Sequence, residues 1–368
     1  MRHPKSRLVA AAAVVGTACA LAATSAAVAG PTHPFAGAGT VPGAYTNAAP
    51  ALSAIYRTGQ GVRGTFVAWK GQNSNNIMYR FKIGAKWSPT GVVPGAHSTT
   101  SPAAAFYIDP HSVDAVVVVW KKLKSTNIDY SQGELGTKGG IKWTKPVDIK
   151  VGKDALAVSY SAPSVIFPLN STHGRVLISW RGPGNHVRYE LGAPSGRGFV
   201  FDPSSWIAGT DASLTDQAPA LTEIAGTGAD SNDSNVYVFW KSPGVKGQLN
   251  YATTPDNVGH GLNGNAKITW TMLGQVPGGK YTETTAAPAA SSVNTHGTGP
   301  LLLAFKGRGG SNIRYLTLSG GVWSPLPIPG VVNGPLAQSN LGPALVNGLL
   351  ANVAIGSSAR IYLHVYTG

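Results

Sequence analysis

The sequence predicts an all-β fold built from one repeated unit, and three observations support this prediction. First, the nine tryptophans fall into two columns, and the first column recurs at intervals of 51 to 65 residues. Second, each copy shows the same order of proline, Val-rich run, turn and tyrosine. Third, no window of a dozen residues keeps the apolar spacing of an amphipathic helix. The first column comprises Trp69, Trp120, Trp180, Trp240 and Phe305, and the second comprises Trp87, Trp143, Trp206, Trp270 and Trp323.

Four short strands are expected in each copy. The first strand follows a proline, which is tolerated at a strand start, and these prolines are Pro50, Pro102, Pro163, Pro219, Pro288 and Pro343. The second strand is the Val-rich run that ends at the first-column aromatic residue. The third strand is centred on a tyrosine, namely Tyr79, Tyr130, Tyr189, Tyr251, Tyr315 or, in the last copy, Tyr362. The fourth strand surrounds the second-column tryptophan.

The sixth copy lacks its fourth strand. It starts at Pro343 and has room for three strands before Gly368. Near the other end of the chain, Phe35–Ala44 aligns without a gap to Trp87–Ala96, which belongs to a fourth strand. The sequence therefore predicts a six-bladed β-propeller with four strands per blade, the last blade being closed by an N-terminal strand that removes the seam of the ring. A β-solenoid is the alternative, but it would not need a split unit.

The expected organisation is a signal peptide at residues 1–29 followed by one propeller domain at residues 30–368. Arg2, Lys5 and Arg7 precede an apolar run, and Ala27–Ala29 has the small residues of a cleavage site, so we expect a secreted, extracellular protein. Cleavage would remove Cys19, the only cysteine, and no later apolar run is long enough to span a membrane. The expected blades cover about residues 48–96, 100–151, 161–212, 217–280, 285–333, and 341–368 together with 33–46.

The charge of the chain favours an anionic partner. After cleavage it would keep 26 of its 29 basic residues and all 15 acidic ones, a net charge of +11. The cations are spread along the chain without a basic arm or a recognisable nucleic-acid module, so nucleic acid is not the expected partner. A secreted protein of this charge is expected to meet acidic glycans, and we expect it to act as a monomer.

A basic residue follows the first-column aromatic in five copies. These cations are Lys70, Lys121, Arg181, Lys241 and Lys306. One interpretation is structural, with the rings filling the wedges between sheets and the cations lying in solvent at the strand ends. The other is functional, because an aromatic ring beside a basic donor can stack on a sugar and bind its hydroxyl or carboxylate groups. The sequence leaves both interpretations open.

The segment Phe66–Gly71, an Asn-rich turn and then Asn76–Tyr79 resembles the blade signature of bacterial and fungal lectin propellers, the fucose-binding and related six- and seven-bladed families. The resemblance extends over every blade and implies sugar pockets between adjacent blades, lined by Trp or Tyr and by a basic donor. Lysine often stands where that family uses arginine, and no acidic residue recurs, so fucose itself is not implied. Carried over, the resemblance implicates Trp69, Lys70, Tyr79, Trp120, Lys121, Tyr130, Trp180, Arg181, Tyr189, Trp240, Lys241, Tyr251, Lys306 and Tyr315.

We expect a binding protein rather than an enzyme, without catalytic residues, metal or cofactor. Sialidases share the six-bladed ring, but their Ser-x-Asp-x-Gly-x-x-Trp box is absent and no two acids pair by spacing. The acidic loop Asp230–Asn235 lacks the glycine and the closing glutamate of a calcium loop. Two other functions stay open, a structural or protein-binding propeller of the cell surface and a sialidase-like glycoside hydrolase.

Overall fold

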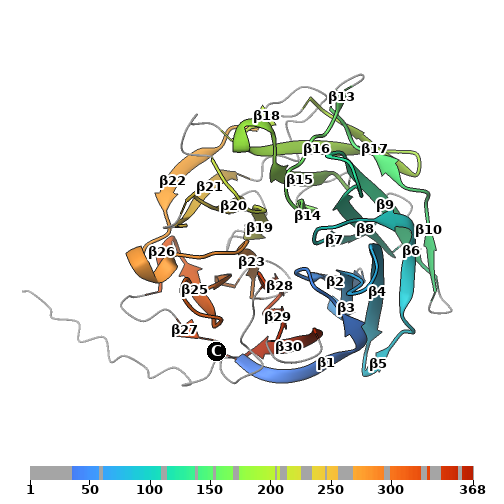
Figure 1. The fold of residues 1–368 in the computed structure, drawn as a ribbon, viewed down its shortest axis with the longest axis horizontal. Coiled ribbons are helices and arrows are strands. Elements are labelled where there is room, and N and C mark those ends of the chain that lie inside the picture. Colours follow the sequence, from blue (N-terminus) through green and yellow to red (C-terminus); the bar gives the residue numbers. More distant parts are fainter. Residues whose placement is uncertain are drawn as a thin grey trace, which may run out of the picture.

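The computed structural model is a ring of six antiparallel sheets around a central channel (Figure 1), which confirms the predicted six-bladed β-propeller. The expected signal peptide and the Asp230–Asn235 loop up to Asp233 lie outside the described residues. In these residues, no helix has the length and apolar character needed to cross a bilayer. The structure describes residues 35–57, 61–108, 114–136, 140–151, 155–168, 174–203, 205–207, 214–224, 234–244, 247–255, 268–293, 299–324, 330–331, 341–354 and 359–367.

The blades follow one another along the chain. Blade 1 contains β2 (Ala51–Arg57), β3 (Gly61–Lys70), β4 (Asn76–Ile83), β5 (Lys86–Trp87) and β6 (Gly91–His97). Blade 2 contains β7 (Ala103–Ile108), β8 (Asp114–Lys121), β9 (Ile128–Leu135), β10 (Ile141–Trp143) and β11 (Val147–Asp148). Blade 3 contains β14 (Ser164–Ile166), β15 (Val176–Arg181), β16 (Val187–Ser195), β17 (Gly198–Phe201) and β18 (Ser205–Trp206).

The second half of the ring has the same plan. Blade 4 contains β19 (Ala220–Ile224), β20 (Asn235–Lys241), β21 (Leu249–Pro255) and β22 (Thr271–Gln275). Blade 5 contains β23 (Ala289–Ser292), β24 (Leu301–Lys306), β25 (Ile313–Ser319), β26 (Val322–Trp323) and β27 (Gly330–Val331). Blade 6 contains β28 (Ala344–Val346), β29 (Leu349–Val353), β30 (Arg360–Tyr366) and β1 (Phe35–Tyr45). Between blades lie the hairpin of β12 (Lys150–Val151) and β13 (Ala155–Leu156) and the 3-10 helix η4 (Gly279–Thr282), whereas η1 (Pro183–Asn185) forms a turn inside blade 3.

The fourth strand is broken in four blades. In blades 1, 2, 3 and 5 two short segments, such as β5 and β6, both pair with the third strand. The first segment continues the hairpin from the third strand, and the second returns to pair with the start of that strand. The predicted four strands per blade are therefore present, with an interruption that was not predicted.

The N-terminal segment closes the ring as predicted. β1 pairs antiparallel with β30, from Phe35 opposite Tyr366 onward, so both ends of the propeller lie in one sheet (Figure 1). The aligned glycines Gly43 and Gly95 have φ values of 64° and 72°, a conformation that glycine adopts without strain. Both glycines lie inside the fourth strand, β1 in blade 6 and β6 in blade 1, at a shift in the pairing register.

The core consists of separate apolar layers between adjacent blades. Along β8, Val117 and Val119 pack toward blade 3, whereas Val116, Val118 and Trp120 pack toward blade 1. Successive side chains of a strand point to opposite faces. The second strands are apolar throughout because both of their faces are covered.

In five of the six blades, a tyrosine of the third strand meets an aromatic residue on the fourth strand of the next blade. The ring centroids of five such pairs are 5.2 to 5.8 Å apart in an edge-on arrangement, the geometry that aromatic quadrupoles favour. The five pairs are Tyr79–Trp143, Tyr130–Phe201, Tyr189–Trp270, Tyr251–Trp323 and Tyr315–Phe35.

One residue of the predicted second column was assigned wrongly. The second-column residue of a blade lies opposite the residue three positions after the third-strand tyrosine. In blade 3 that residue is Gly192, and it pairs with Phe201. Trp206 lies in β18 and pairs with Arg188 instead. Phe201 therefore belongs to the second column, and Trp206 is an additional tryptophan outside it.

Candidate ligand-binding site

The loops that lead into the first strands form a repeated structure on one face of the ring. A buried hydroxyl four residues before the proline accepts a hydrogen bond of 3.0 to 3.3 Å from the backbone N–H two residues later, a local turn typical of Ser and Thr. The backbone N–H of the same residue donates to a carbonyl in the preceding blade's hairpin between strands two and three. We call these Ser and Thr residues the capping residues, namely Thr46, Ser98, Ser159, Thr215 and Thr284.

This turn explains why the hairpin and the loop share one face. The hydrogen bond from the Thr215 N–H to the Asn185 carbonyl, for example, joins blade 4 to the hairpin of blade 3. The sequence analysis missed this element, although its signal was present as Ser or Thr at a fixed distance before each proline.

The five cations that follow the first column lie at the ends of the second strands, on this face. We call them the collar cations, namely Lys70, Lys121, Arg181, Lys241 and Lys306. Lys70 and Lys241 are buried, and the other three are partly exposed. Lys70 Nζ donates to Asn47 Oδ1 at 2.8 Å, and Lys306 Nζ donates to Thr285 Oγ1 at 3.2 Å. Both acceptors immediately follow the capping residue of their own blade, so each lysine joins its second strand to the loop that enters the blade.

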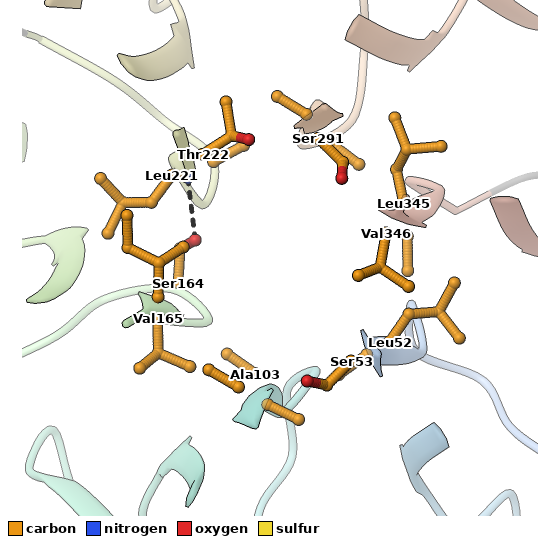
Figure 2. Close-up of a pocket in the computed structure, with 18 of the residues that line it drawn as sticks. Leu52, Ser53, Ala103, Ser164, Val165, Leu221, Thr222, Ser291, Leu345 and Val346 are labelled. Atoms are coloured by element: carbon orange, nitrogen blue, oxygen red, sulfur yellow. Dashed lines mark hydrogen bonds between the residues drawn. The ribbon is translucent and has the colours of Figure 1, made fainter. Parts of the chain in front are cut away.

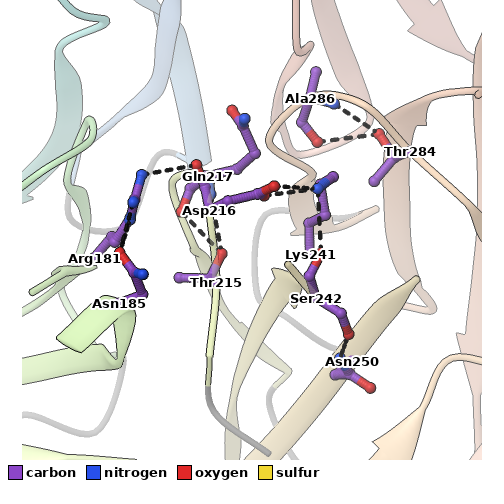
Figure 3. A network of polar contacts seen from close by, with 10 residues as sticks. All are labelled: Arg181, Asn185, Thr215, Asp216, Gln217, Lys241, Ser242, Asn250, Thr284 and Ala286. Carbon is purple, nitrogen blue, oxygen red and sulfur yellow. Dashed lines mark hydrogen bonds and ion pairs between the residues drawn. The ribbon is translucent and has the colours of Figure 1, made fainter. Parts of the chain in front are cut away.

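The network around blade 4 is the most connected part of the collar (Figure 3). Arg181 donates to Asn185 Oδ1 and to the Asp216 backbone carbonyl at 3.1 Å. Lys241 Nζ lies 2.6 Å from Asp216 Oδ2. The loop residue Asp216 therefore holds cations of two adjacent blades, one through its carbonyl and the other through its carboxylate.

Most of the collar charge has no acidic partner. Among the described residues, Lys241 is the one collar cation in an ion pair. The partners of Lys70, Arg181 and Lys306 are neutral oxygens, which hold a cation without cancelling its charge. Burial lowers the pKa of Lys70 from its ordinary value.

The first-column aromatic side chains are not at the surface. The rings of Trp69, Trp120, Trp180, Trp240 and Phe305 are between 0% and 2% exposed. They fill the wedges between blades, as the structural interpretation expects, and the Trp180 Nε1–H donates to the Val158 carbonyl of the neighbouring blade connection at 2.9 Å. In this conformation, a sugar cannot reach these ring faces.

The implicated tyrosines also join adjacent blades. Tyr189 donates to the Ile268 carbonyl at 2.8 Å, and the Tyr130 hydroxyl accepts from the Phe199 N–H at 3.0 Å. The Tyr251 hydroxyl accepts from Trp323 Nε1 at 3.1 Å. Burial raises the pKa of Tyr130, Tyr189 and Tyr315. The structure thus brings the cations together at one face and places the tyrosines and tryptophans behind them, between the sheets.

The central channel has a wall of small and apolar residues (Figure 2). Its cavity of about 270 Å³ is lined by the first strands of all six blades and by the Ala-Pro, Ser-Pro and Gly-Pro segments that precede them. Leu52, Val165, Leu221 and Leu345 are among the residues around it. Glu223 is the one acidic residue among the described residues that line the channel. This wall lacks the pair of carboxyl groups that glycoside hydrolysis ordinarily uses.

A pair of carboxyl groups does lie at the outer part of blade 2. Asp129 and Asp148 face each other across β9 and β11, and Lys122 Nζ lies 3.5 Å from Asp129 Oδ2 and 3.0 Å from Asp148 Oδ1. Burial raises the pKa of Asp129 to about 7, whereas the hydrogen bond from Asp129 lowers the pKa of Asp148. No cluster of three or more metal-ligating side chains occurs in the described parts of the chain.

These aspartates belong to a row of side chains that crosses the sheet from the first column outward, and such a row occurs in five of the six sheets. The row consists of the first-column aromatic, its partner on the third strand and the next partner on the fourth strand. Cross-strand partners point to the same face of a sheet. The rows are Trp69–Met78–Val92, Trp120–Asp129–Asp148, Trp180–Arg188–Trp206, Trp240–Asn250–Gln275 and, as far as its side chains are described, Phe305–Arg314.

The sequence matches no protein-family model and no curated protein. The structure is similar to a mutant of the Aleuria aurantia lectin in complex with alpha-methyl-L-fucoside, with a TM-score of 0.51 and 14% identity over 79% of this chain and 80% of that one. It is similar to the SapL1 lectin in complex with alpha methyl fucoside, with a TM-score of 0.50 and 13% identity over 87% of this chain and 89% of that one.

A Hadza microbial sialidase is similar as well, with a TM-score of 0.54 and 13% identity over 87% of this chain. The chain spans 65% of the length of that sialidase. At these identities the likeness shows a shared fold, and the residues of this chain must support any function. The predicted resemblance to lectin propellers is thus confirmed for the fold.

Proposed function

We propose that this protein is a carbohydrate-binding propeller that binds anionic glycans through the collar face. The observation that carries the proposal is the collar itself. Five cations occupy corresponding strand ends on one face, three of them partly exposed, and a single carboxylate compensates them in the described residues. A face of one charge attracts and retains a ligand of the opposite sign. The shared fold with two lectins that were solved with a fucoside supports a sugar as the ligand.

Because the first-column rings are buried, we assign the ligand contacts expected at the first-column positions to the collar cations that follow them. Lys121 and Lys306 are partly exposed and have no acidic partner in the described residues. The implicated tryptophans and tyrosines then act indirectly, by fixing the ends of the strands that carry the collar cations. Weak contacts at several blades would add up on a polymeric glycan.

The test is binding of immobilised polysaccharides at 50 and 300 mM salt. We expect polygalacturonate or sulfated dextran to bind at the lower concentration and to lose at least about tenfold in affinity at the higher one, because salt screens exposed charges. Neutral dextran serves as the control ligand. Affinity for the charged polymers that is unchanged by salt would contradict the anionic part of the proposal.

A matched pair of double variants locates the binding face. Lys121→Gln with Lys306→Gln removes two collar charges, whereas Lys86→Gln with Lys142→Gln removes two charges from the outer strands β5 and β10. We expect the collar pair to weaken binding about tenfold and the control pair to weaken it less than twofold. Equal losses would show that net charge alone retains the glycan.

We also propose that the chain is secreted after cleavage behind Ala29 and acts as a monomer. The sequence of residues 1–29 supports export. Expression in a secreting host followed by N-terminal sequencing should return Gly30 as the first residue, and light scattering should give the mass of one chain. Retention of residues 1–29 in the exported protein, or the mass of a dimer, would contradict these two statements.

A further inference from the structure

Trp206 is a tryptophan that the packing of the ring does not use. All nine tryptophans lie in the described residues, and Trp206 is the only exposed one, at 48%. Phe201 takes its place in the column that packs against the neighbouring tyrosine. β18, which carries Trp206, lies at the outer edge of the ring (Figure 1). An exposed indole presents a flat apolar face and a polar edge that are open to a ligand.

Arg188 lies over the Trp206 ring. Its guanidinium carbon is 4.8 Å from the ring centroid, within the range of a cation–π interaction. The stem of Arg188 runs across Gly182, where a Cβ atom would lie 2.4 Å from the arginine Cγ. Only glycine leaves room for the stem at this position. The His186 ring is 5.3 Å from the Trp206 ring at an angle of 41°, so two basic side chains border one exposed indole.

The hydrogen-bonding capacity of Arg188 is not used by the described residues. Its Nε is buried and has no hydrogen-bond partner among them, and none of their acidic side chains forms an ion pair with it. Glu190 is two residues further along β16, so it lies on the same face of the strand. It is 1% exposed, and neither of its carboxyl oxygens has a hydrogen-bond partner. Buried polar groups are normally paired. Glu190 is too deeply buried for a ligand to reach, whereas Arg188 is partly exposed beside an open ring, so its unpaired guanidinium is available to a bound molecule.

The corresponding positions of the other blades lack this combination. The same row carries Met78 and Val92 in blade 1 and an aspartate pair in blade 2. Blade 5 has Arg314 at the position of Arg188, but Arg314 Nη1 donates to the Tyr281 carbonyl at 3.1 Å. The exposed indole with an unpaired arginine is therefore a property of blade 3 in the described part of the ring.

We propose that Trp206, Arg188 and His186 form a binding site for a pyranose that carries an anionic group. The open indole would stack on the C–H face of the sugar ring. The planar guanidinium would pair with a carboxylate or sulfate, which accept two parallel hydrogen bonds from arginine. This inference rests on the proposed carbohydrate-binding function and assigns one specific site to it, at the blade 3 side of the wedge between blades 2 and 3.

The test compares Arg188→Gln and Trp206→Ala with Arg314→Gln, a matched control that removes the same charge from the same row position of another blade. Binding is measured by calorimetry with a tri-galacturonate, a sulfated glucan trisaccharide and a neutral glucan trisaccharide. We expect Arg188→Gln and Trp206→Ala to weaken binding of a charged trisaccharide at least tenfold and Arg314→Gln to weaken it less than twofold. The charged trisaccharide that binds more tightly identifies the anionic group.

A second measurement reads the site directly. Because Trp206 is the exposed tryptophan, acrylamide quenching of the fluorescence should fall when the trisaccharide binds, and Trp206→Phe should abolish this protection. Equal losses in Arg188→Gln and Arg314→Gln, unchanged binding in Trp206→Ala, or equal affinity for the neutral trisaccharide would each overturn the site and leave the collar proposal standing. Wild-type protein that binds no charged oligosaccharide or polysaccharide at low salt would overturn the proposed function as well.

Discussion

Each of the five described side-chain rows has an inner end at the first column and an outer end on the fourth strand. The two ends differ in how much their residues vary from blade to blade. The inner end is a buried aromatic ring in all five rows described, with tryptophan in four and phenylalanine in one. The outer end is apolar in blade 1, ionic in blade 2, a cation–π pair in blade 3 and an amide pair in blade 4. The same backbone therefore repeats one chemistry at its centre and a different chemistry at each outer edge.

Packing explains the difference. An inner ring touches both its own sheet and the neighbouring blade, so a change in its volume leaves a cavity or a clash. An outer residue has solvent on one side, and a substitution there alters recognition more than folding. The inner end fixes the geometry of the ring, and the outer end is free to give each wedge its own ligand preference.

The largest expected effect is at the inner end. Trp180→Ala should lower the free energy of unfolding by about 3–5 kcal/mol, because it removes a fully buried ring and its hydrogen bond to the Val158 carbonyl. Trp206→Ala, at the outer end of the same row, should cost less than about 1 kcal/mol. Urea unfolding of both variants measures the difference, and similar losses would break the proposed division between the two ends.

Glu190 provides a test of how far the buried part of blade 3 extends, because it is a buried acid two residues from Arg188 on the same strand face. Burial is the main cause that raises the pKa of its carboxyl to about 9, and Asp202 adds to it. The folded state therefore holds the proton more tightly than the unfolded state, whose pKa is near 4.5, so stability is complete below about pH 4.5 and is lost as the pH rises toward 9. At 1.36 kcal/mol per unit, the loss through this group between pH 5 and pH 7 is roughly 2–3 kcal/mol.

Glu190→Gln isolates this contribution. The amide has nearly the same shape and does not titrate, so the difference in unfolding free energy between variant and wild type should grow in favour of the variant as the pH rises from 5 to 7. Asp129, whose pKa is also raised, and Asp148, whose pKa is lowered, cancel in this difference because both proteins contain them. A difference that stays constant over this range would show that Glu190 is ionised or solvated in the folded protein.

The capping hydroxyls should give a smaller effect. Thr215→Val keeps the shape of the side chain but removes the acceptor of the Gln217 N–H, which should cost about 1–2 kcal/mol. Thr285→Val, next to another capping residue, removes only the exposed acceptor of Lys306 Nζ and should cost less than about 0.5 kcal/mol. Thermal or urea unfolding distinguishes them, and equal costs would show that the turn does not depend on its hydroxyl.

The fold could be predicted from the sequence because the inner end repeats. Three local patterns can be read from the sequence without knowledge of the contacts. They are the two aromatic columns, the proline before each first strand and the alignment of Phe35–Ala44 with Trp87–Ala96. The repeated pattern predicted six blades and the closing strand. The prediction did not include the interruption of the fourth strands, although the sequence carries a sign of it. In the four interrupted blades a Ser, Thr or Asp follows the second-column aromatic, and a proline comes directly or one residue after it, namely Pro89, Pro146, Pro203 and Pro325.

The site was less predictable because its residues do not repeat. Spacing alone placed Trp206 in the second column, whereas the strand register gives that position to Phe201. The sequence placed the cations together, but it could not show that Asp216 pairs with Lys241. Nor could it show that the tyrosine hydroxyls bond to the next blade. Such partners are distant in the chain and become visible only in three dimensions.

The smallest expected effect concerns the one carboxylate that compensates the collar. Asp216→Asn keeps an oxygen that can accept from Lys241, so the strand ends should stay in place while the face gains one unit of positive charge. Affinity for an anionic polysaccharide at 50 mM salt should rise about twofold to threefold, and the gain should vanish at 300 mM salt because the added charge acts through a screened field. Asp114→Asn makes the same change at the start of β8, at the opposite end of the strand from the collar, and should leave the affinity within about 1.5-fold. The comparison is read by titration of one polymer with the three proteins. Equal gains in both variants would mean that the glycan responds to the total charge of the propeller, and the outer chemistry of the individual blades would then contribute little to recognition.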